Sequence, residues 1–283
     1  MLLGHPVAHS LSPRFQSAAL RAAGLDVEYT ALDVTPAALT ETLRQLVAEG
    51  AAGNVTVPHK ETLAHLCDRQ TPVAEHVGAV NTFWVDGKTL VGDNTDVSGF
   101  AGAALALRGE PVSPGNRVAL LGAGGAAAAV LMAIADWPGV EVHVWNRSAE
   151  RARALAGRFG AQAVATAEEA LDDSSLVVNA TSIGLDGVSQ PIDVARLPQG
   201  ADVIDLVYGP NETAWVRAAR AAGHRAMDGL AMLIEQGALA FERWFGMAPD
   251  RDAMWRAAAP DRNRFNGIKQ PIDPEPPPPL PPP

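Results

Sequence analysis

Short apolar runs alternate along the chain with longer segments in which apolar residues recur every three or four positions. The runs predict β-strands at Val27–Val34, Gly53–Val57, Val118–Leu121, Val140–Trp145, Leu176–Asn179 and Asp202–Leu206. The longer segments predict helices at Pro36–Glu49, Asp96–Arg108, Ala126–Ala135, Ala149–Arg158, Glu212–Ala222 and Gly229–Phe245. Strands that alternate with helices are typical of an α/β fold with parallel sheets, which is the fold class we expect.

Two features of this pattern bear on how the chain is organised. The turn-rich segment Gly109–Asn116 separates a first group of elements from a second, and the helix at Gly229–Phe245 is long enough to return to the first group. The uncharged run Val118–Ala135 reaches the length of a membrane span. Glycines interrupt that run, so a strand, a turn and an Ala-rich helix explain it better than membrane insertion.

Composition narrows the class of protein. Of the 283 residues, 47% are hydrophobic and 19% are charged, as in packed globular proteins. The net charge of −10 argues against general affinity for nucleic acid or for anionic membranes. The single cysteine, Cys67, excludes an internal disulfide and a cysteine zinc cluster, and the sequence indicates neither a signal peptide nor a metal site. We therefore expect a protein of the reducing cytoplasm without general affinity for nucleic acid or membranes.

A glycine-rich turn follows the strand predicted at Val118–Leu121. Its residues, Gly122-Ala123-Gly124-Gly125-Ala126-Ala127, fit the pattern G-x-G-x-x-A between a strand and a helix. The first glycine permits a tight turn, the second lets the backbone approach a pyrophosphate, and the small sixth residue allows close packing. The pattern alone is weak in an Ala-rich chain, but its place between a strand and a helix indicates a dinucleotide site.

The end of the next strand indicates which dinucleotide is bound. Enzymes that use NAD usually place an acidic residue there to bind the ribose 2′-hydroxyl. Here the strand is followed by Asn146-Arg147-Ser148, and Arg151 stands one helical turn later. Guanidinium groups pair with a 2′-phosphate, so we expect NADP as the cofactor rather than NAD. The alternative is a pair of solvated arginines at the start of a helix.

Three polar clusters lie outside the glycine-rich unit, at positions where the loops of an α/β protein carry chemistry. They are His9–Pro13, Asn54–Lys60, and Asn81-Thr82 together with Gly92–Asp96. Each cluster by itself is explained as a helix cap, as turn residues or as a surface lysine. Together they supply hydroxyls, amides, a lysine and a carboxylate, a combination that suits a polyhydroxylated ligand.

Taken in order along the chain, these segments resemble the motifs of the shikimate dehydrogenase family, from Gly4 to about Trp255. The motifs are Gly4-x-Pro6-x-x-His9-Ser10-x-Ser12-Pro13, Asn54-Val55-Thr56-x-Pro58-x-Lys60, Gly78-Ala79-Val80-Asn81-Thr82, Gly92-x-Asn94-Thr95-Asp96-x-x-Gly99-Phe100, Gly122-Ala123-Gly124-Gly125-Ala126, Asn146-Arg147-Ser148, Asn179-Ala180-Thr181-Ser182-x-Gly184, Asp205-x-x-Tyr208-x-Pro210 and Gly229-Leu230-x-Met232-Leu233-x-x-Gln236. The number and order of these motifs make the resemblance specific.

The resemblance implies two domains. Residues 1–97 and 230–258 would form a split α/β substrate-binding domain, around an inserted Rossmann-like NADP-binding domain at residues 98–229. Residues 259–283 have no counterpart in the family, and their prolines predict a disordered tail; recruitment of a proline-binding domain is a less favoured alternative. The chain begins almost at Gly4, so we expect a shortened first strand that weakens the substrate-domain sheet.

The resemblance also implies an activity, the NADP-dependent interconversion of 3-dehydroshikimate and shikimate in aromatic biosynthesis. Lys60 and Asp96 match the catalytic pair, and the substrate-binding positions are these two with Ser10, Ser12, Thr56, Asn81, Tyr208 and Gln236. The cofactor-binding positions are Gly122, Ala123, Gly124, Gly125, Ala126, Asn146, Arg147, Ser148, Arg151, Leu206 and Gly229. The residue types agree with this reaction, because a lysine beside an aspartate supplies a proton and positive charge to a ketone oxygen during hydride transfer.

Two other functions stay open on the sequence alone. A relative that acts on quinate or on an aminoshikimate would carry the same motifs, because these substrates differ by one ring substituent. The missing acidic residue after the strand at Val140–Trp145 argues against an NAD-dependent quinate enzyme. A non-catalytic sensor of the same metabolites would not need the Lys60 and Asp96 pair. The protein is expected to be a monomer or a homodimer.

Overall fold

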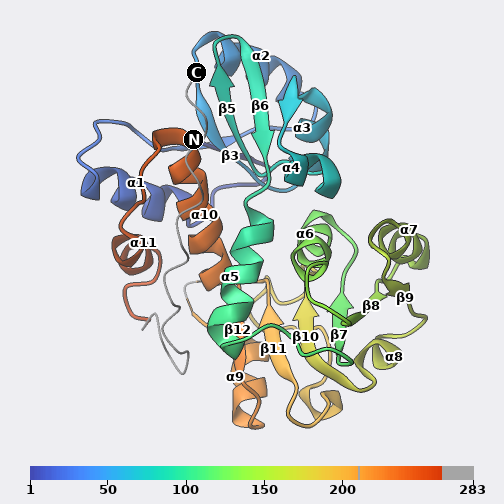
Figure 1. The fold of residues 1–283 in the computed structure, drawn as a ribbon. Helices are drawn as coiled ribbons and strands as arrows, with labels where there is room; N and C mark the ends of the chain where they lie inside the picture. The colour runs from blue at the N-terminus through green and yellow to red at the C-terminus, as the bar shows by residue number, and fades with distance from the viewer. Residues whose placement is uncertain (210, 263–283) are drawn as a thin grey trace.

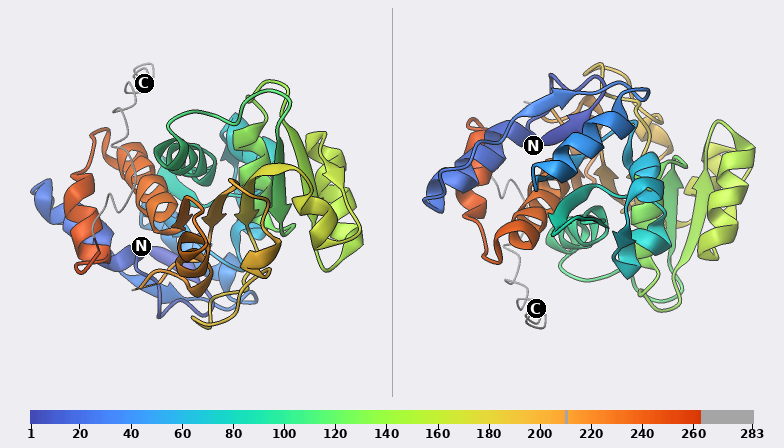
Figure 2. Two further views of the ribbon diagram at one scale, coloured as in Figure 1. Left: turned by 90° about the horizontal axis from the view of Figure 1, so that it is seen from below. Right: turned by 90° about the horizontal axis from the view of Figure 1, so that it is seen from above.

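Two six-stranded sheets lie in two parts of the molecule, at the top and the bottom of Figure 1, with helices packed on them and between them. The computed structural model describes residues 1–209 and 211–262. The chain first builds one sheet, then the other, and returns to the first sheet with its last two helices. Figure 2 shows the same arrangement from below and from above.

The first sheet is mixed. Its strands are β1 (Leu2–Gly4), β2 (Ala31–Asp33), β3 (Ala52–Val55), β4 (Arg69–Gln70), β5 (Thr82–Asp86) and β6 (Thr89–Asp93), in the order β2-β1-β3-β5-β6-β4. β1 pairs in parallel with β2 and β3, whereas β5 is antiparallel to β3 and β6. The helices of this stretch are α1 (Ser12–Ala22), α2 (Leu39–Ala48), α3 (Lys60–Leu66) and α4 (Pro72–Val77). The short first strand is therefore an interior strand, with neighbours on both sides.

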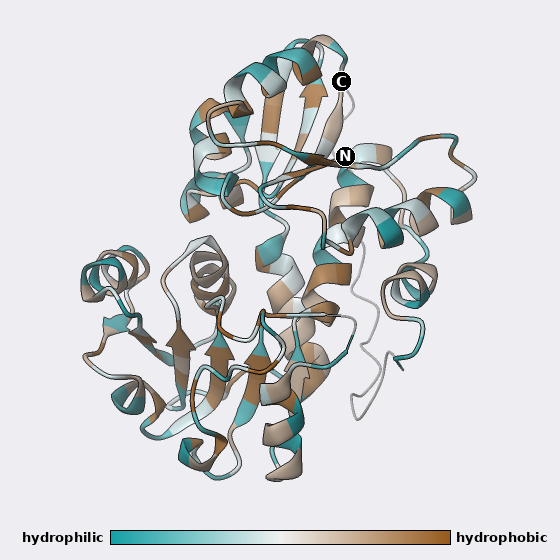
Figure 3. Ribbon diagram, turned by 180° about the vertical axis from the view of Figure 1, so that it is seen from behind, coloured by the Kyte–Doolittle hydropathy of each residue, from teal (hydrophilic) through white to brown (hydrophobic). Residues whose placement is uncertain are grey.

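The second sheet is entirely parallel. Its strands are β7 (Arg117–Leu121), β8 (Glu141–Trp145), β9 (Gln162–Ala163), β10 (Ser174–Asn179), β11 (Asp202–Asp205) and β12 (Ala226–Asp228), in the order β12-β11-β10-β7-β8-β9. The accompanying helices are α5 (Asp96–Arg108), α6 (Gly125–Ile134), α7 (Ala149–Phe159), α8 (Ala167–Leu171) and α9 (Ala214–Ala221), with a 3₁₀ turn, η1, at Val194–Arg196. Residues such as Leu120, Val178 and Ile204 are fully buried, because helices cover both faces of a parallel sheet. Figure 3 shows these strands in the colour of hydrophobic residues.

The last two helices, α10 (Leu230–Phe245) and α11 (Arg251–Ala258), pack against the N-terminal part of the chain. Ile234 and Phe241 of α10 share one apolar core with Leu2 of β1 and Phe15 of α1. α11 packs on α1, and α10 lies beside α5, which links the two sheets (Figures 1 and 2). The expected return of the long C-terminal helix to the first unit is thus confirmed.

Most of the elements expected from the pattern are present with shifted ends, and the α/β class is confirmed. The strand predicted at Val27–Val34 is wrong over its first half, because only Ala31–Asp33 pairs with β1. Tyr29 is nevertheless buried, so its apolar pattern reflects packing and not a strand ladder. The helix predicted from Pro36 begins at Leu39 instead.

The run Val118–Ala135 divides into β7, the glycine turn and α6, as the glycines indicated. No helix in the described part of the chain is long and apolar enough to cross a membrane.

The first residues of the expected tail are part of the packed structure. Ala259 is buried in the core around α1 and α11. The Arg262 guanidinium binds both carboxylate oxygens of Asp228 at 3.0 Å. A tail boundary at residue 259 is therefore too early. The proline-rich remainder of that expectation, residues 263–283, lies outside the described residues.

Candidate active site

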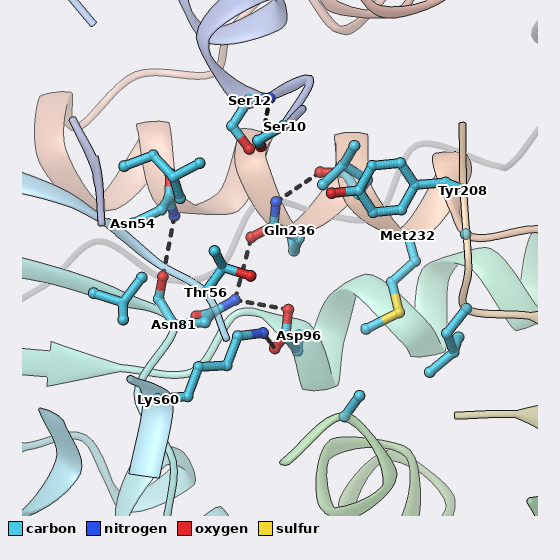
Figure 4. Close-up of a pocket in the computed structure, with 16 residues that line it drawn as sticks. Ser10, Ser12, Asn54, Thr56, Lys60, Asn81, Asp96, Tyr208, Met232 and Gln236 are labelled. Atoms are coloured by element: carbon cyan, nitrogen blue, oxygen red, sulfur yellow. Dashed lines mark hydrogen bonds and ion pairs between the residues drawn. The ribbon is translucent and has the colours of Figure 1, made fainter. Parts of the chain in front are cut away.

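A pocket of about 130 Å³ lies where residues of α3, α5 and α10 meet, between the two sheets. It is lined by all the side chains that the resemblance assigned to the substrate, which are labelled in Figure 4: Ser10, Ser12, Thr56, Lys60, Asn81, Asp96, Tyr208 and Gln236. These residues come from widely separated stretches of the chain, so the fold, and not local sequence, brings them together.

An ion pair lies within the pocket. Lys60 is the first residue of α3 and Asp96 the first residue of α5, so both stand at helix N-termini beside the pocket. Lys60 Nζ is 2.6 Å from Asp96 Oδ2. The side chains of Lys60 and Asp96 are 20% and 7% exposed, so the carboxylate is buried while the lysine side chain is partly accessible. A helix N-terminus also favours the negative charge of Asp96.

The second oxygen of Asp96 is held by an amide. Asn81, which precedes β5, donates from Nδ2 to Asp96 Oδ1 at 2.8 Å and to Gln236 Oε1 at 3.2 Å. Its own Oδ1 accepts the Thr95 N–H at 2.8 Å. Gln236 of α10 in turn donates to the Leu233 carbonyl at 2.7 Å. These side chains are therefore oriented by one another, which is the pre-organisation that a catalytic or binding site needs.

Two further residues extend this network, and the sequence analysis did not assign them to the site. Asn54 lines the pocket and donates from Nδ2 to the Asn81 carbonyl at 3.3 Å. The buried Tyr29 hydroxyl donates to Asn54 Oδ1 at 2.7 Å. The signal for Asn54 is its place at the start of the Asn54-Val55-Thr56 motif, on a strand where a buried amide needs a partner. No sequence signal indicated Tyr29.

Hydroxyl groups form another part of the wall, and Ser10 and Ser12 lie on the side away from Lys60 in Figure 4. Ser10 Oγ accepts the Ser12 N–H at 3.2 Å, and the Tyr208 ring lines the same pocket. Burial raises the pKa of Tyr208; the Ser10 side chain opposes this rise, and the charge on Asp96 adds to it. Tyr208 is therefore a neutral hydroxyl at neutral pH and can donate a hydrogen bond to an anionic group.

The glycine turn has the shape that a phosphate-binding loop requires. Gly122 has a φ of +122°, and a Cβ there would lie 2.7 Å from the Ala180 carbonyl oxygen, so glycine is needed. A Cβ at Gly124 would meet nothing within 4 Å, so space is free beside the turn. α6 begins at Gly125, and the first N–H groups of a helix have no partner within the helix. This combination of free space and free N–H groups fits a pyrophosphate.

The two arginines expected to bind a 2′-phosphate follow β8, next to the glycine turn. The two segments adjoin because the Gly122 N–H donates to the Trp145 carbonyl at 2.7 Å. Arg147 and Arg151 are exposed, and neither guanidinium bonds to any residue in the described ranges. Ser148 has a structural task as well, since its Oγ accepts the Arg151 N–H at 3.4 Å and caps α7. Free cationic groups beside a phosphate-binding turn fit a dinucleotide with an additional phosphate.

The predicted cofactor and substrate sites share residues. Ala126, Leu206 and Gly229, which the resemblance assigned to the cofactor, also line the pocket. A Cβ at Gly229 would lie 2.2 Å from the Leu206 carbonyl oxygen, so only glycine allows this close approach of two backbone segments. Met232 lines the same part of the pocket; its motif was recognised, but no role was assigned to it. A cofactor on the glycine turn can thus extend to the substrate.

Three protein-family models match the chain in sequence order. Residues 2–83 match the shikimate dehydrogenase substrate binding domain, residues 105–190 the shikimate / quinate 5-dehydrogenase model, and residues 229–259 the shikimate 5'-dehydrogenase C-terminal domain. These ranges include the pocket residues Ser10, Lys60 and Gln236, together with the glycine turn.

Curated relatives and solved structures are similar to the chain over nearly its whole length. Shikimate dehydrogenase (NADP(+)) from Sinorhizobium medicae is 42% identical over 262 residues, which are 89% of this chain and 91% of that protein. The enzyme of the same name from Thermus thermophilus is 44% identical, over 91% of this chain and 96% of that protein. The crystal structure of shikimate 5-dehydrogenase from Thermus thermophilus in complex with NADP(H) and shikimate superimposes with a TM-score of 0.83 at 42% identity, covering 91% and 97% of the two chains. With these similarities added to the pocket and the glycine turn, the chain belongs to the shikimate dehydrogenase family.

Proposed function

We propose that this protein interconverts 3-dehydroshikimate and shikimate by hydride transfer with NADP, in the pathway that leads to aromatic amino acids. One observation carries the proposal: the Lys60–Asp96 ion pair lies in a pocket that also includes Ala126, Leu206 and Gly229 of the expected cofactor site. A proton-transfer pair is thus adjacent to the place from which a hydride would come. The relatives named as NADP-dependent shikimate dehydrogenases support the same activity.

The two walls of the pocket match the two ends of shikimate. Ser10, Ser12 and Tyr208 supply hydroxyl groups that bind the substrate carboxylate, for which a neutral, partly buried Tyr208 is suited. Asn81 and Gln236, already oriented by their mutual hydrogen bond, bind ring hydroxyls together with Thr56. We call Ser10, Ser12 and Tyr208 the carboxylate wall. By holding the substrate carboxylate, this wall fixes the orientation of the ring relative to Lys60.

Lys60 transfers the proton. In reduction its ammonium group donates a proton to the carbonyl oxygen as that oxygen becomes negative, and in oxidation its neutral amine accepts the hydroxyl proton. Asp96 holds Lys60 Nζ in place and accepts a hydrogen bond from a neighbouring ring hydroxyl. Most basic residues of this chain are arginines: of the 22, only Lys60, Lys88 and Lys269 are lysines, and one of these stands in the pocket. A lysine is needed at position 60 because an arginine stays protonated and cannot act as a base.

The residues proposed to hold NADP are those that the geometry of the second sheet favours. The backbone around Gly122, Gly124 and Gly125 takes the pyrophosphate, and Arg147 with Arg151 takes the 2′-phosphate. When bound, NADP accepts a hydride and NADPH donates one. Leu206 and Gly229 define the space for the nicotinamide, since their close approach leaves no room for a side chain at position 229.

The proposal includes the organisation of the chain and its setting. Residues 1–97 with residues 230–262 form the substrate-binding domain, the end being extended by the packed residues after α11, and residues 98–229 form the NADP-binding domain. A reducing cytoplasm suits the single cysteine, Cys67, which is half-buried and whose pKa is raised to about 12 by burial and by Asp68. The protein acts as a monomer or a homodimer on a small-molecule substrate.

An absorbance assay of nicotinamide reduction tests the function directly. Purified protein is offered shikimate or quinate, each with NADP or with NAD. We expect turnover with shikimate and NADP only. A preference for quinate or for NAD would assign the protein to a sister activity of the family. Absence of turnover in all four mixtures, with shikimate still bound in a calorimetric titration, would favour a metabolite sensor.

A further inference from the structure

The residue three places before Asp96 is also an aspartate, and it is buried. Asp93 ends β6, and its side chain is only 4% exposed. Its Oδ1 accepts the Asn94 N–H at 2.8 Å and the hydroxyl of Thr71. Its Oδ2 accepts the Arg243 Nε–H at 2.9 Å. A buried carboxylate is costly unless it is paired, and Arg243 is its only cationic partner in the described part of the chain.

The turn that Asp93 begins leads directly to the catalytic pair. Asn94 accepts the Asp96 N–H on its Oδ1 at 3.1 Å and donates from Nδ2 to the Ala79 carbonyl at 2.8 Å. The Asp93 carbonyl accepts the Asn81 N–H at 3.1 Å. The side chain of Asp93 therefore contacts Asn94 and its backbone contacts Asn81, the two asparagines that form hydrogen bonds with Asp96.

Arg243 connects this turn to α10. It lies two helical turns after Gln236, and residues at that spacing share one face of a helix. On this face Gln236 accepts a hydrogen bond from Asn81, which itself binds Asp96, and Arg243 donates a hydrogen bond to Asp93. α10 also lies beside α5, the helix that Asp96 begins (Figure 1). One helix thus holds the catalytic turn at two successive points.

We propose that Arg243 and Asp93 are a positioning pair, which holds the turn from residue 93 to 96 against α10 and so sets the Lys60–Asp96 geometry. Neither residue touches the pocket, and the pair acts through Asn94 and Asn81. The proposal rests on the proposed function for its kinetic consequence. Its structural part, the position of Lys60, is measurable without turnover.

The central variant is Arg243→Met, which removes the cation and keeps a stem of similar length. We expect kcat for shikimate oxidation to fall about tenfold, because small displacements of catalytic groups have effects of that order or more. KM for NADP should stay within twofold, since the cofactor residues are untouched. Arg243→Lys, which keeps a positive charge, should recover most of the loss. The double variant Asp93→Asn, Arg243→Met also removes the buried charge that would be left unpaired, and it should recover part of the lost kcat.

A matched control separates positioning from loss of stability. Arg251 binds α10 through ion pairs to Glu235 and Glu242 at 3.0 Å, and it forms no hydrogen bond or ion pair with the 93–96 turn. Arg251→Met should lower the unfolding temperature and leave kcat unchanged. The proposal fails if Arg243→Met retains wild-type kcat, or if Arg251→Met loses as much kcat as Arg243→Met.

Lysine NMR gives a readout that is independent of turnover. Protein labelled with ¹³C at lysine has three side-chain signals, and the Lys60→Met variant identifies that of Lys60. In Arg243→Met the Lys60 signal should move while the signal of Lys88, in the turn between β5 and β6, stays in place. An unchanged Lys60 signal would overturn the positioning role. If the wild type shows no turnover, the proposed function fails, and this spectrum still decides on the positioning pair.

Discussion

The substrate side of the pocket is a closed hydrogen-bond network, whereas the cofactor side consists of open backbone and unpaired charge. Asp96 is bound by Lys60 and by Asn81 through both of its oxygens. Arg147 and Arg151, by contrast, bond to no residue in the ranges the structure covers, and the space beside the glycine turn is free. The protein itself positions the groups that perform chemistry, while the groups that bind phosphate are left free to pair with it.

Two buried carboxylates show the same difference in electrostatic terms. Asp96 is paired with the ammonium of Lys60. Asp205, at the end of β11, is fully buried, and within residues 1–209 and 211–262 it accepts hydrogen bonds only from the neutral groups of Asn179, Thr213 and the Val207 N–H. Burial raises the pKa of Asp205 to about 6, against the lowering effect of these hydrogen bonds. A buried carboxylate on the catalytic side has a cation, and this one on the cofactor side has none among its hydrogen-bond partners.

The largest expected effect is on the catalytic pair. Lys60→Met removes the proton donor and should lower kcat about a thousandfold, the range of general acid–base catalysis. The dissociation constant of shikimate should change much less, because the carboxylate wall is intact. Steady-state kinetics and calorimetry measure the two effects. Lys88→Met, in the turn between β5 and β6, is the matched control, and a Lys60→Met variant with normal turnover would show that the pair is not catalytic.

The next effect concerns Asp205 and pH. Its pKa is higher in the folded state than the 3.8 of a free carboxyl, so folding favours the protonated form. The resulting stabilisation is fully present below about pH 4 and is lost as pH rises through 6; two pKa units correspond to about 3 kcal/mol. Asp205→Asn has no such titration, so relative to the wild type it should gain stability between pH 4 and pH 7. Urea unfolding at several pH values measures this, and parallel pH profiles for the two proteins would contradict it.

A smaller effect is expected from the unpaired arginines. The double variant Arg147→Gln, Arg151→Gln should raise KM for NADP about tenfold and leave KM for NAD unchanged, because each lost guanidinium is a charge-assisted partner of the 2′-phosphate only. The unfolding temperature should not change, since neither side chain has a partner in the described residues. Arg153→Gln, also on α7 and exposed, is the control. Equal losses with NAD and NADP would remove the argument for a 2′-phosphate site.

The smallest effect tests the carboxylate wall. Tyr208→Phe removes one neutral hydroxyl and should raise KM for shikimate about fivefold, the usual contribution of one hydrogen bond. kcat should stay near its wild-type value, because Lys60 and Asp96 are untouched. Initial-rate kinetics separates these quantities, and a loss confined to kcat would move Tyr208 from binding to the chemical step.

The sequence predicted the order of elements best where strands are buried on both faces. The strands β7, β10 and β11 appear in the sequence as apolar runs because helices cover both of their faces. The strands β4 and β9 are only two residues long, which is too short for a hydrophobic pattern to be recognised. Tyr29 lies within the strand predicted at Val27–Val34, yet it does not pair in the sheet. It is buried, and its hydroxyl donates a hydrogen bond to Asn54. The apolar pattern indicates which residues are buried, but a buried segment does not have to pair with another strand.

For the site, residue types were predictable and contacts were not. Asparagine is a residue type common in turns, so the sequence alone does not assign Asn81 to a network. Only the fold places it against Gln236, which lies 155 residues away in the chain. Arg243 looks like a solvated residue at the end of a helix, and its pairing with Asp93 needs β6 and α10 to be adjacent. Such long-range pairs depend on topology, which short motifs do not encode.

The core shared by β1, α1 and α10 has a consequence for synthesis of the protein on the ribosome. The segment that carries Phe15 is made before its partner helix, Leu230–Phe245, which follows about 215 residues later in the chain. At rates of roughly 5–20 residues per second, the interval is about 10 to 45 seconds. During that time the nascent chain exposes an apolar surface that only its own C-terminal part can cover. Synthesis of Leu230–Phe245 is therefore the step that allows the pocket to form, because Gln236 of this helix lines it.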